Sequence, residues 1–370
     1  MNFISSKFVK KIAKNLFYIM FKPLFLDKIY LIIQSLYFKL QKVMMVSVPV
    51  ISIGNIEMGG TGKTPLVEAM AKRISKDGYK VAILSRGYGR KQNIFKNIFK
   101  KEDVIIVDYN KHTAEEVGDE PLLLSKATKA KVYVANNRVL AAKTAMEDGC
   151  DIILMDDGHQ NFKIQKDFSI IVTSALDLKH DPSLYKTIPF GRLREDWENA
   201  LDRTEAIVIV GYDKSMLESH YYYNYTSRVA PDVKIFKILA ETKNQENYTG
   251  KKFLAFTGIG QPEKFFFTLK QCGAIIVEKH VFNDHHRYKE KEVISLIQRA
   301  KELEVDLVTT SKDYIKISQY NNQYDNIYHN IYQLEISYNE PQVDRLYNFV
   351  FDHLIANRIL DVNKRIYLTL

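Results

Sequence analysis

The chain contains 370 residues, of which 46% are hydrophobic, so it is long enough for two domains and apolar enough to bury a core in each. Its formal net charge of +9 is partly concentrated near the N-terminus, which indicates a local anionic partner surface and argues against nucleic-acid binding along the whole chain. The two cysteines, Cys150 and Cys272, are far apart and lack metal-ligand spacing. This usage is typical of a reducing compartment and argues against a disulfide framework.

Residues 1–45 are predicted to form amphipathic helices that dock on a membrane. Apolar side chains recur at helical spacing over residues 3–21, while lysines fall largely on the opposite side. Pro23 separates this stretch from a second helical one over residues 24–40. No run reaches the roughly 18 apolar residues needed to span a bilayer, so we expect the segment to lie in the interface of an anionic leaflet. An ordinary helical hairpin packed on the core is the alternative.

Residues 46–65 read VSVPVISIGNIEMGGTGKTP and combine a β-branched run, a glycine-rich turn and the start of a helical stretch. Strand, loop and helix in this order are the setting of a phosphate-binding P-loop. The glycines allow backbone N–H groups to converge on a phosphate, and the helix N-terminus adds a partial positive charge. Lys63 is then expected to reach the β- and γ-phosphates of a nucleotide, with the Thr64 hydroxyl on Mg²⁺. A glycine-rich loop that binds nothing is the alternative.

This loop departs from the usual G-x-x-x-x-G-K-[ST] pattern, because Glu57 stands five positions before Gly62. The local form GGTGKT resembles a variant loop in which two adjacent glycines precede x-G-K-T. Met58 stands where that variant often carries a lysine. The candidate phosphate-binding residues are Gly59, Gly60, Thr61, Gly62, Lys63 and Thr64.

Strands and helices alternate after the P-loop, which predicts a nucleotide-binding α/β domain over residues 46–205. The strand-like runs lie at 81–84, 104–107, 132–135, 152–155 and 168–172, with helical stretches at 66–76, 114–128 and 138–148. This βαβ pattern implies a mostly parallel sheet covered on both faces. In such sheets ligands bind beyond the carboxyl ends of the strands. Polar residues just past each strand are therefore the candidates for chemistry.

Two pairs of acidic residues are candidates. Asp156 and Asp157 follow the run at 152–155, where a carboxylate commonly makes a second Mg²⁺ contact, directly or through water. A helix cap or a turn is the alternative for these two residues. Asp119 and Glu120 open a helical stretch and are either capping residues or the source of a general base.

Basic residues and histidines provide further candidates. Arg192 and Arg194 lie in a turn-like stretch and suit bidentate phosphate contact, or else belong to a solvated surface. His285 follows Asp284, and a neighbouring carboxylate can hold a histidine in one tautomer. Metal binding and a plain surface position are the alternatives for His285. The stretch TTSKD at 309–313 follows another strand-like run and is a similar candidate.

The second half of the chain predicts a smaller α/β domain over residues 251–340. Strand-like runs occur at 206–211, 253–258, 274–277 and 305–310, and helical stretches at 262–271 and 289–303. Residues 206–250 are predicted to contain a polar, Tyr-rich linker or hairpin. Residues 341–370 are predicted as a C-terminal tail that begins helical.

Five sequence blocks resemble, in their order, the tetraacyldisaccharide 4′-kinase family of lipid A biosynthesis. They are GNIEMGGTGKTP, LSRGYGR, GDEP, DDGHQN and the pair NDHH with TTSKD. The resemblance implies transfer of the γ-phosphate of ATP, with Mg²⁺, to the 4′-hydroxyl of a tetraacyldisaccharide 1-phosphate. The implied fold is α/β, with two Rossmann-like lobes of the P-loop type, a site between them and an N-terminal amphipathic segment.

The resemblance also implies partners and a location. The partners are a lipid A precursor disaccharide and an anionic membrane surface, and we expect no nucleic acid and no obligate protein partner. The implied location is the cytoplasmic face of the bacterial inner membrane, with peripheral or monotopic attachment.

Individual roles follow from the matching positions. Asp119 corresponds to the catalytic base of the family and His285 to the histidine that pairs with it. The implied catalytic set is Asp119, His285, Arg194 and Glu195; the implied metal set is Thr64, Asp156 and Asp157. Tyr88, in SRGYGR, corresponds to an active-site aromatic and is assigned to cofactor binding.

Several positions differ from the family pattern. The usual DDGFQH reads DDGHQN here, which places His159 and Asn161 after the two carboxylates. Arg192 stands where the family carries proline, and Ser311 where it carries glutamate. Two other functions remain open on the sequence alone: a membrane-associated P-loop ATPase switch, and a P-loop kinase of a soluble metabolite.

Overall fold

The protein is described by a computed structural model that covers residues 30–31, 38, 40–91, 104–175, 186–214, 217, 227–228, 230–318, 331–357 and 359–360. The amphipathic helices predicted for residues 1–45 therefore lie outside the described residues, apart from a few positions such as Tyr30 and Phe38. Among the described residues, no helix combines the length and the apolar character needed to cross a bilayer.

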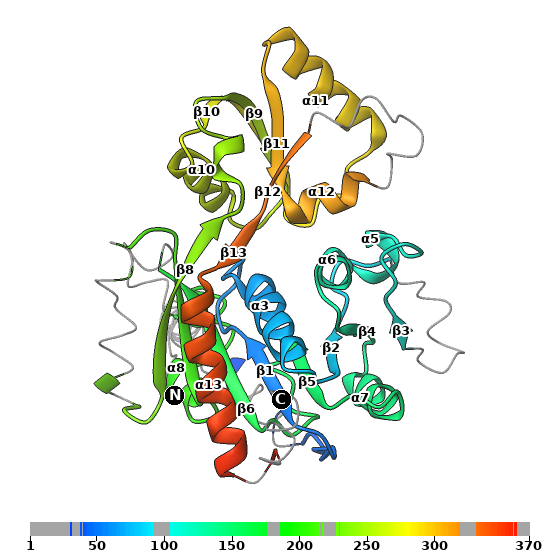
Figure 1. Ribbon diagram of the computed structural model, residues 1–370, viewed down its shortest axis with the longest axis vertical. Helices are drawn as coiled ribbons and strands as arrows, with labels where there is room; N and C mark the ends of the chain where they lie inside the picture. The colour runs from blue at the N-terminus through cyan, green and yellow to red at the C-terminus, as the bar shows by residue number, and fades with distance from the viewer. Residues whose placement is uncertain are drawn as a thin grey trace, which may run out of the picture.

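A nine-stranded sheet forms the centre of the first lobe (Figure 1). Its strand order is β13-β8-β7-β6-β1-β5-β2-β4-β3. The strands are β1 (Val50–Gly54), β2 (Val81–Ser85), β3 (Ile105–Ile106), β4 (Lys131–Val134), β5 (Ile152–Asp156), β6 (Phe168–Ser174), β7 (Ala206–Gly211), β8 (Lys234–Thr242) and β13 (Ile336–Tyr338). The seven strands from β8 to β4 run parallel, while β13 and β3 join the two edges antiparallel.

Helices cover both faces of this sheet, as its strand composition requires. They are α3 (Lys63–Lys76), α5 (Ala114–Val117), α6 (Asp119–Ala127), α7 (Arg138–Glu147), α8 (Trp197–Leu201) and α13 (Glu340–Ala356). Because side chains alternate along a strand, Ile51 and Ile53 enter the core beneath α3 and α13. Val50 enters a second core on the opposite face, together with the alanines of α7.

The second lobe is a smaller three-layer unit with a four-stranded parallel sheet of order β10-β9-β11-β12. Its elements are β9 (Lys252–Thr257), α10 (Pro262–Gln271), β10 (Ile275–Val281), α11 (Glu290–Glu302), β11 (Asp306–Thr310), α12 (Ser311–Ile317) and β12 (Ile331–Leu334). Leu254 and Phe256 pack on the α11 side, whereas Phe253 and Ala255 pack on the α10 side. The prediction of two α/β lobes is therefore confirmed.

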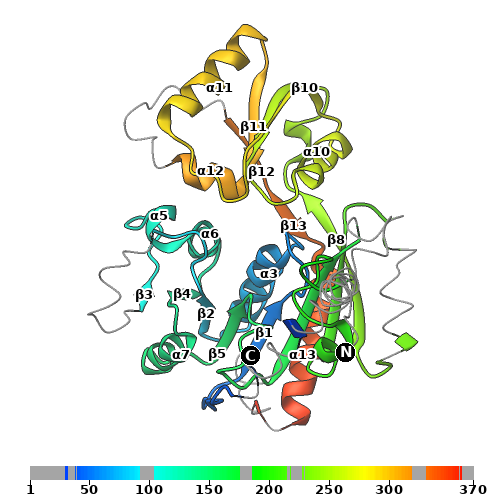
Figure 2. The same ribbon diagram turned by 180° about the vertical axis from the view of Figure 1, so that it is seen from behind.

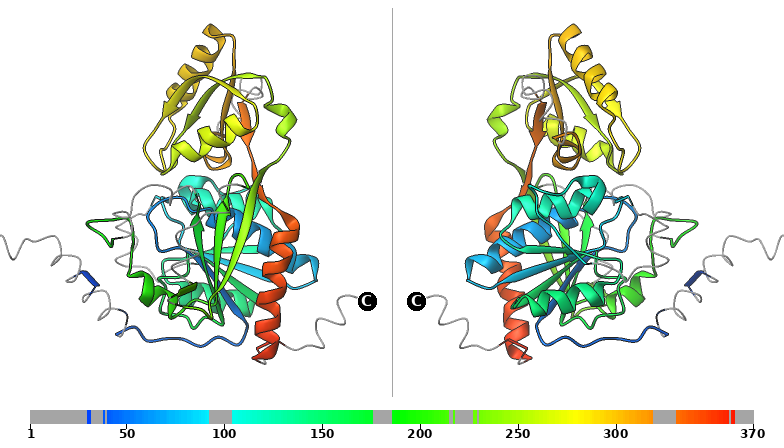
Figure 3. Two further views of the ribbon diagram at one scale, coloured as in Figure 1. Left: turned by 90° about the vertical axis from the view of Figure 1, so that its left-hand side faces the viewer. Right: turned by 90° about the vertical axis from the view of Figure 1, so that its right-hand side faces the viewer.

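Two strands join the lobes. The chain leaves the first lobe through β8 and the short 3₁₀ helix η3 (Gln245–Asn247), and it returns from β12 into β13, which pairs with β8. Figures 2 and 3 show the second lobe standing at one end of the first, with these strands between them. The carboxyl end of β1 leads to this junction, because the Lys264 side chain of α10 contacts the backbone of Gly60.

Some predicted boundaries are wrong. Residues 206–250 are not a linker or hairpin, because β7 and β8 extend the first sheet in parallel with β6. Residues 341–370 are not simply a tail, since α13 buries Leu346, Tyr347 and Phe351 in the core of the first lobe. The local sequence of a fully apolar strand does not indicate which sheet it joins. Its neighbouring strand is determined by packing between segments that are far apart in the sequence.

Two local features also differ from the predictions. The helix predicted over residues 114–128 divides into α5 and α6 at Gly118, which adopts φ 99°. Such a positive φ is accessible to glycine and interrupts helical geometry. The run at 104–107 forms only the short edge strand β3, antiparallel to β4.

Candidate active site

The P-loop joins β1 to α3 and keeps the geometry that its glycines permit. Gly59 and Gly62 adopt φ values of 110° and 96°, which side chains other than glycine rarely take. A Cβ at Gly60 would meet nothing within 4 Å, so the loop is open on that side. The N-terminus of α3 at Gly62 receives no side-chain cap. Its amides are thus oriented for an anionic ligand, and the loop fits a nucleotide phosphate.

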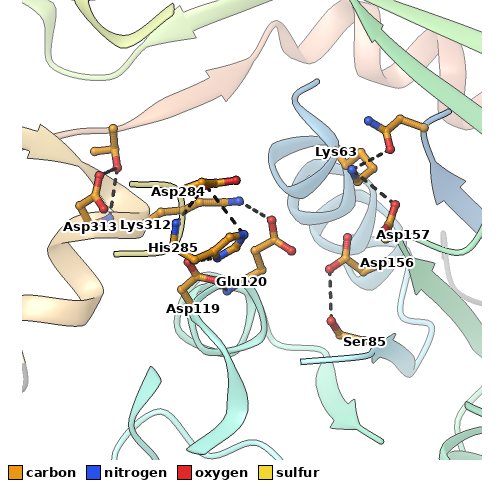
Figure 4. A network of polar contacts seen from close by, with 12 residues as sticks. Lys63, Ser85, Asp119, Glu120, Asp156, Asp157, Asp284, His285, Lys312 and Asp313 are labelled. Carbon is orange, nitrogen blue, oxygen red and sulfur yellow. Dashed lines mark hydrogen bonds and ion pairs between the residues drawn. The ribbon is translucent and has the colours of Figure 1, made fainter. Parts of the chain in front are cut away.

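Lys63 lies at the centre of a charged group on the first lobe (Figure 4). Its Nζ donates to Asn55 Oδ1 at 3.0 Å and lies 3.4 Å from Asp157 Oδ1. Arg194 reaches the same carboxylate at 3.2 Å, and buried Arg138 donates to the Asp157 carbonyl at 2.8 Å. Burial raises the pKa of Asp157, but these three cations outweigh it and hold that pKa below its usual range.

Asp156 differs from its neighbour because it faces few cations. Ser85 Oγ donates to Asp156 Oδ2 at 3.4 Å, while the buried Oδ1 has no hydrogen-bond partner among the described residues. Burial, followed by the negative charges of Glu120 and Asp157, raises the pKa of Asp156 to about 7. A divalent cation beside this carboxylate would stabilise its ionised form.

The donor set fits Mg²⁺ in the manner of P-loop proteins. Thr64 is buried at the start of α3, and Asp156 ends β5, which pairs directly with β1 and with β2. The described residues hold no cluster of three or more His, Cys, Asp or Glu side chains that would form an all-protein metal site. Mg²⁺ bound with a nucleotide takes one or two protein oxygens, and phosphates and waters complete its octahedron.

The second charged group spans both lobes. Asp119 opens α6 in the first lobe, and its Oδ2 lies 3.1 Å from Nδ1 of His285 in the second lobe. Burial raises the pKa of Asp119, but the hydrogen bond with His285 and the charges of Lys312 and Lys316 lower it to about 2. The same hydrogen bond raises the pKa of His285 above its ordinary value, with burial acting in the opposite direction.

Further contacts tie the lobes together around this pair. Lys312, at the start of α12, forms an ion pair with Glu120. Arg287 donates to the carbonyl of Gly89 at 2.8 Å. Tyr88 places its ring edge-on to His285, with 5.0 Å between ring centroids. Tyr88, which the family resemblance assigns to cofactor binding, therefore lies on the Asp119 side of the site.

Arg194 and Glu195 are adjacent in the chain but enter different surroundings. Arg194 reaches Asp157, whereas Glu195 is 1% exposed and lies in a polar network beneath the site. Gln160 Nε2 donates to Glu195 Oε1 at 2.8 Å and also to the Asn55 carbonyl at 3.0 Å, while Arg203 binds Glu195 Oε2 at 2.5 Å. Through Gln160, these contacts connect Glu195 to Asn55, which follows strand β1.

His159, one of the departures from the family pattern, belongs to the same network. Its Nε2 lies 3.2 Å from the Arg203 guanidinium and 3.6 Å from Glu195 Oε1. Burial, together with the charges of Lys166 and Arg203, lowers its pKa well below 6.5, so the ring is neutral. Its backbone also packs closely against Gly54, where no Cβ would fit. His159 therefore fills a buried structural position.

The structure thus brings most predicted residues to one junction between the lobes. Lys63, Asp157 and Arg194 form one group, Asp119 and His285 form the other, and Glu120 lies between them in Figure 4. The electrostatic influence of Glu120 on Asp156 connects the two groups.

Sequence reasoning missed several residues that shape the site. Asn55 orients Lys63, and Arg138 binds the backbone of Asp157. Asn55 follows the strand directly, a position at which it could have been recognised. Arg138 begins α7, far from any motif, and nothing in its local sequence indicates its contact.

Comparisons with known proteins show the family to which the chain belongs. A family model described as tetraacyldisaccharide-1-P 4′-kinase matches residues 19–353. The chain belongs to this family. It is 38% identical over 273 residues to the tetraacyldisaccharide 4′-kinase of Parvibaculum lavamentivorans, with 74% of each chain covered. The corresponding protein of Bradyrhizobium diazoefficiens is 32% identical over 311 residues, covering 84% of this chain and 86% of the relative.

A solved structure shares the fold. It is the crystal structure of LpxK from Aquifex aeolicus in complex with ATP, with a TM-score of 0.63 and 26% sequence identity. The match covers 89% of this chain and 97% of that one. Membership of the family confirms the predictions of an ATP-dependent kinase of lipid A biosynthesis and of ATP with Mg²⁺ as its cofactors.

Proposed function

We propose that this chain phosphorylates the 4′-hydroxyl of a tetraacyldisaccharide 1-phosphate, with the Asp119–His285 pair receiving the hydroxyl proton. The 3.1 Å contact of this pair across the lobes is the observation that carries the proposal. It supports an acceptor site at the junction, opposite the P-loop. The names of the matching family and relatives support the identity of the acceptor.

On the donor side, the P-loop amides and Lys63 bind the nucleotide phosphates, and Thr64 with Asp156 holds the metal. Mg²⁺ neutralises charge on the phosphates when it is bound. Arg194 is held beside Lys63 by Asp157, so that two cations face the site of transfer. Phosphoryl transfer depends mostly on positioning and on such electrostatic stabilisation.

On the acceptor side, Asp119 orients the hydroxyl and takes its proton as the new P–O bond forms and the bond from the γ-phosphorus to the leaving ADP breaks. A pKa of about 2 makes Asp119 a weak base while His285 is protonated. A weak base suffices for a loose transition state, in which the attacking oxygen loses its proton late. The two groups share a hydrogen bond, so they titrate as a pair.

The membrane location is part of the proposal. The net charge of +9 and the basic, apolar N-terminal sequence support contact with an anionic inner-membrane surface on its cytoplasmic face. A lipid acceptor would then keep its acyl chains near the bilayer while its sugar enters the junction. No protein partner is required by this scheme.

One assay tests the proposal against both rival functions. The full chain is incubated with labelled ATP, Mg²⁺ and a lipid A disaccharide 1-phosphate precursor in mixed micelles. Label on the 4′-position of the lipid supports the lipid kinase. Release of inorganic phosphate without lipid labelling supports an ATPase switch and overturns the proposal. Failure of both, with ATP still bound, favours a kinase of a soluble metabolite.

A further inference from the structure

Three side chains outside the P-loop bind alternate carbonyl groups of the loop. Arg192 donates to the Met58 carbonyl at 2.9 Å, and Lys264 Nζ donates to the Gly60 carbonyl at 2.7 Å. The Tyr338 hydroxyl donates to the Gly62 carbonyl at 2.7 Å. The three donors come from a first-lobe loop, from α10 of the second lobe and from the returning strand β13.

This alternation has a geometric consequence. In a planar trans peptide, the carbonyl of one residue and the N–H of the next point in opposite directions. Donors that hold the carbonyls of residues 58, 60 and 62 outward therefore direct the N–H groups of Gly59, Thr61 and Lys63 toward the other side of the backbone. Convergent N–H groups are what a phosphate-binding loop requires.

Two of the donors are buried and well placed for this role. Lys264 is 8% exposed, and Tyr338 is 5% exposed. Burial raises the pKa of Tyr338 well above 10, so its hydroxyl keeps the proton that it donates. A Cβ at Gly62 would collide with that hydroxyl, which together with the positive φ makes glycine necessary there.

We propose that Lys264 and Tyr338 are positioning residues for ATP, which aim the amides of Thr61 and Lys63 at its phosphates. Lys264 thus places a determinant of nucleotide affinity in the second lobe. This inference rests on the proposed function, because it assumes that the P-loop binds ATP. Lys264 itself touches neither the reacting atoms nor the acceptor in this scheme.

If Lys264 had a purely structural role, its substitution would affect ligand binding differently. If it only tied the lobes together, its loss would weaken the binding of ATP and of the acceptor alike, because both bind at the junction. Lys312 provides the comparison, since it also joins the lobes but contacts Glu120 and not the P-loop carbonyls. Removing the Lys312 amine is expected to raise the Kd for ATP less than removing the Lys264 amine, because the P-loop carbonyls keep their donors.

The test compares Lys264→Met with Lys264→Arg, Lys312→Met and Lys270→Met in the full chain. Lys270 is exposed on the same helix and serves as the matched control. ATP affinity is measured by calorimetry without acceptor, and KM for ATP and for the lipid is measured separately. We expect Lys264→Met to raise the Kd for ATP about tenfold, the loss of one charge-assisted hydrogen bond. Lys264→Arg retains a donor and is expected to restore most of the affinity.

The outcomes are distinct. An unchanged Kd for ATP in Lys264→Met overturns the inference, as does an equal rise in KM for ATP and for the lipid. Thermal unfolding shows whether each variant is folded; should Lys264→Met unfold, Tyr338→Phe applies the same test at Gly62 and must raise the Kd for ATP. A wild-type chain that binds ATP but does not label the lipid contradicts the proposed function alone. A wild-type chain that does not bind ATP contradicts both.

Discussion

Two buried carboxylates at the junction, Asp119 and Asp156, have opposite electrostatic surroundings. Asp119 faces His285 and Lys312 of the second lobe, and its pKa falls to about 2 despite burial. Asp156 accepts a hydrogen bond from a serine hydroxyl; burial and two further carboxylates outweigh the charges of Lys63 and Arg138, so its pKa rises to about 7. The cations that lower the pKa of Asp119 belong to the protein, whereas in the proposed scheme the ionised form of Asp156 would be stabilised by the Mg²⁺ that accompanies the nucleotide. The following predictions test this contrast, beginning with the largest effect.

Asp119→Ala is expected to lower kcat by about 10²–10⁴-fold, the range for a lost general base. The variant removes the proposed proton acceptor and leaves His285 without its partner across the lobes. Turnover of the lipid is measured with saturating ATP. Asp232→Ala, at an exposed position of the same lobe, is the control. Near-wild-type turnover in Asp119→Ala would remove this residue from the base role.

Asp156→Asn is expected to raise the Mg²⁺ concentration for half-maximal activity by about 10–100-fold, as for loss of a group that supports a metal. The reason is that Asp156 Oδ1 is buried without a partner among the described residues, while Asp157 is already bound by cations. Mg²⁺ titrations at fixed ATP measure the shift. Asp157→Asn is the matched comparison. A larger shift in Asp157→Asn would assign the metal contact to Asp157 instead.

His285→Gln is expected to move the acid limb of kcat/KM to higher pH. Loss of the hydrogen bond removes one influence that lowers the pKa of Asp119, while burial still raises it, so Asp119 becomes protonated at a higher pH. The pH profile of kcat/KM, measured for wild type and variant, reports this shift. His286→Gln, on the same loop, is the control. An acid limb at the wild-type position would show that His285 does not act through Asp119.

The Asp119–His285 pair also predicts how the stability of the fold depends on pH. The lowered pKa of Asp119 stabilises the fold above its ordinary value of 3.8, and this is lost as pH falls toward 2. The raised pKa of His285 stabilises the fold below its ordinary value of 6.5, and this is lost as pH rises through the raised value. Between these two pH limits, the free energy of unfolding of the wild type is expected to exceed that of His285→Gln by the largest amount. Denaturant titrations at several pH values measure this difference. A difference that does not change with pH would contradict the prediction.

Deleting residues 1–20 is expected to have the smallest effect on the chemistry. The deletion should reduce recovery of the protein with membranes while ATP binding stays unchanged, because the P-loop contacts described here lie elsewhere. Sedimentation with anionic vesicles and calorimetry with ATP measure the two properties. Equal partition of the full and shortened chains would argue against membrane docking by this segment.

Local sequence was sufficient where local geometry decides the structure. The β-branched run, the glycines and the helix after Lys63 predict the P-loop because each requirement is met within twenty residues. The helix at 262–271 was predicted with its observed ends, since Pro262 suits the first helical turn. Strand-end positions also indicate Asp156 and Asp157 as candidate site residues.

The sequence by itself determined the parts of this protein whose physics is local: the phosphate loop, the alternation of strands and helices, and the motif residues of the family. Only the tertiary structure decided that β7 and β8 extend the first sheet, that α13 returns to its core, and that Glu195 is buried beside Gln160 and Arg203. It also decided the contact of Lys264 with Gly60, which are 204 positions apart. Such contacts depend on the packing of whole lobes, and no periodicity or turn signal near either residue encodes them.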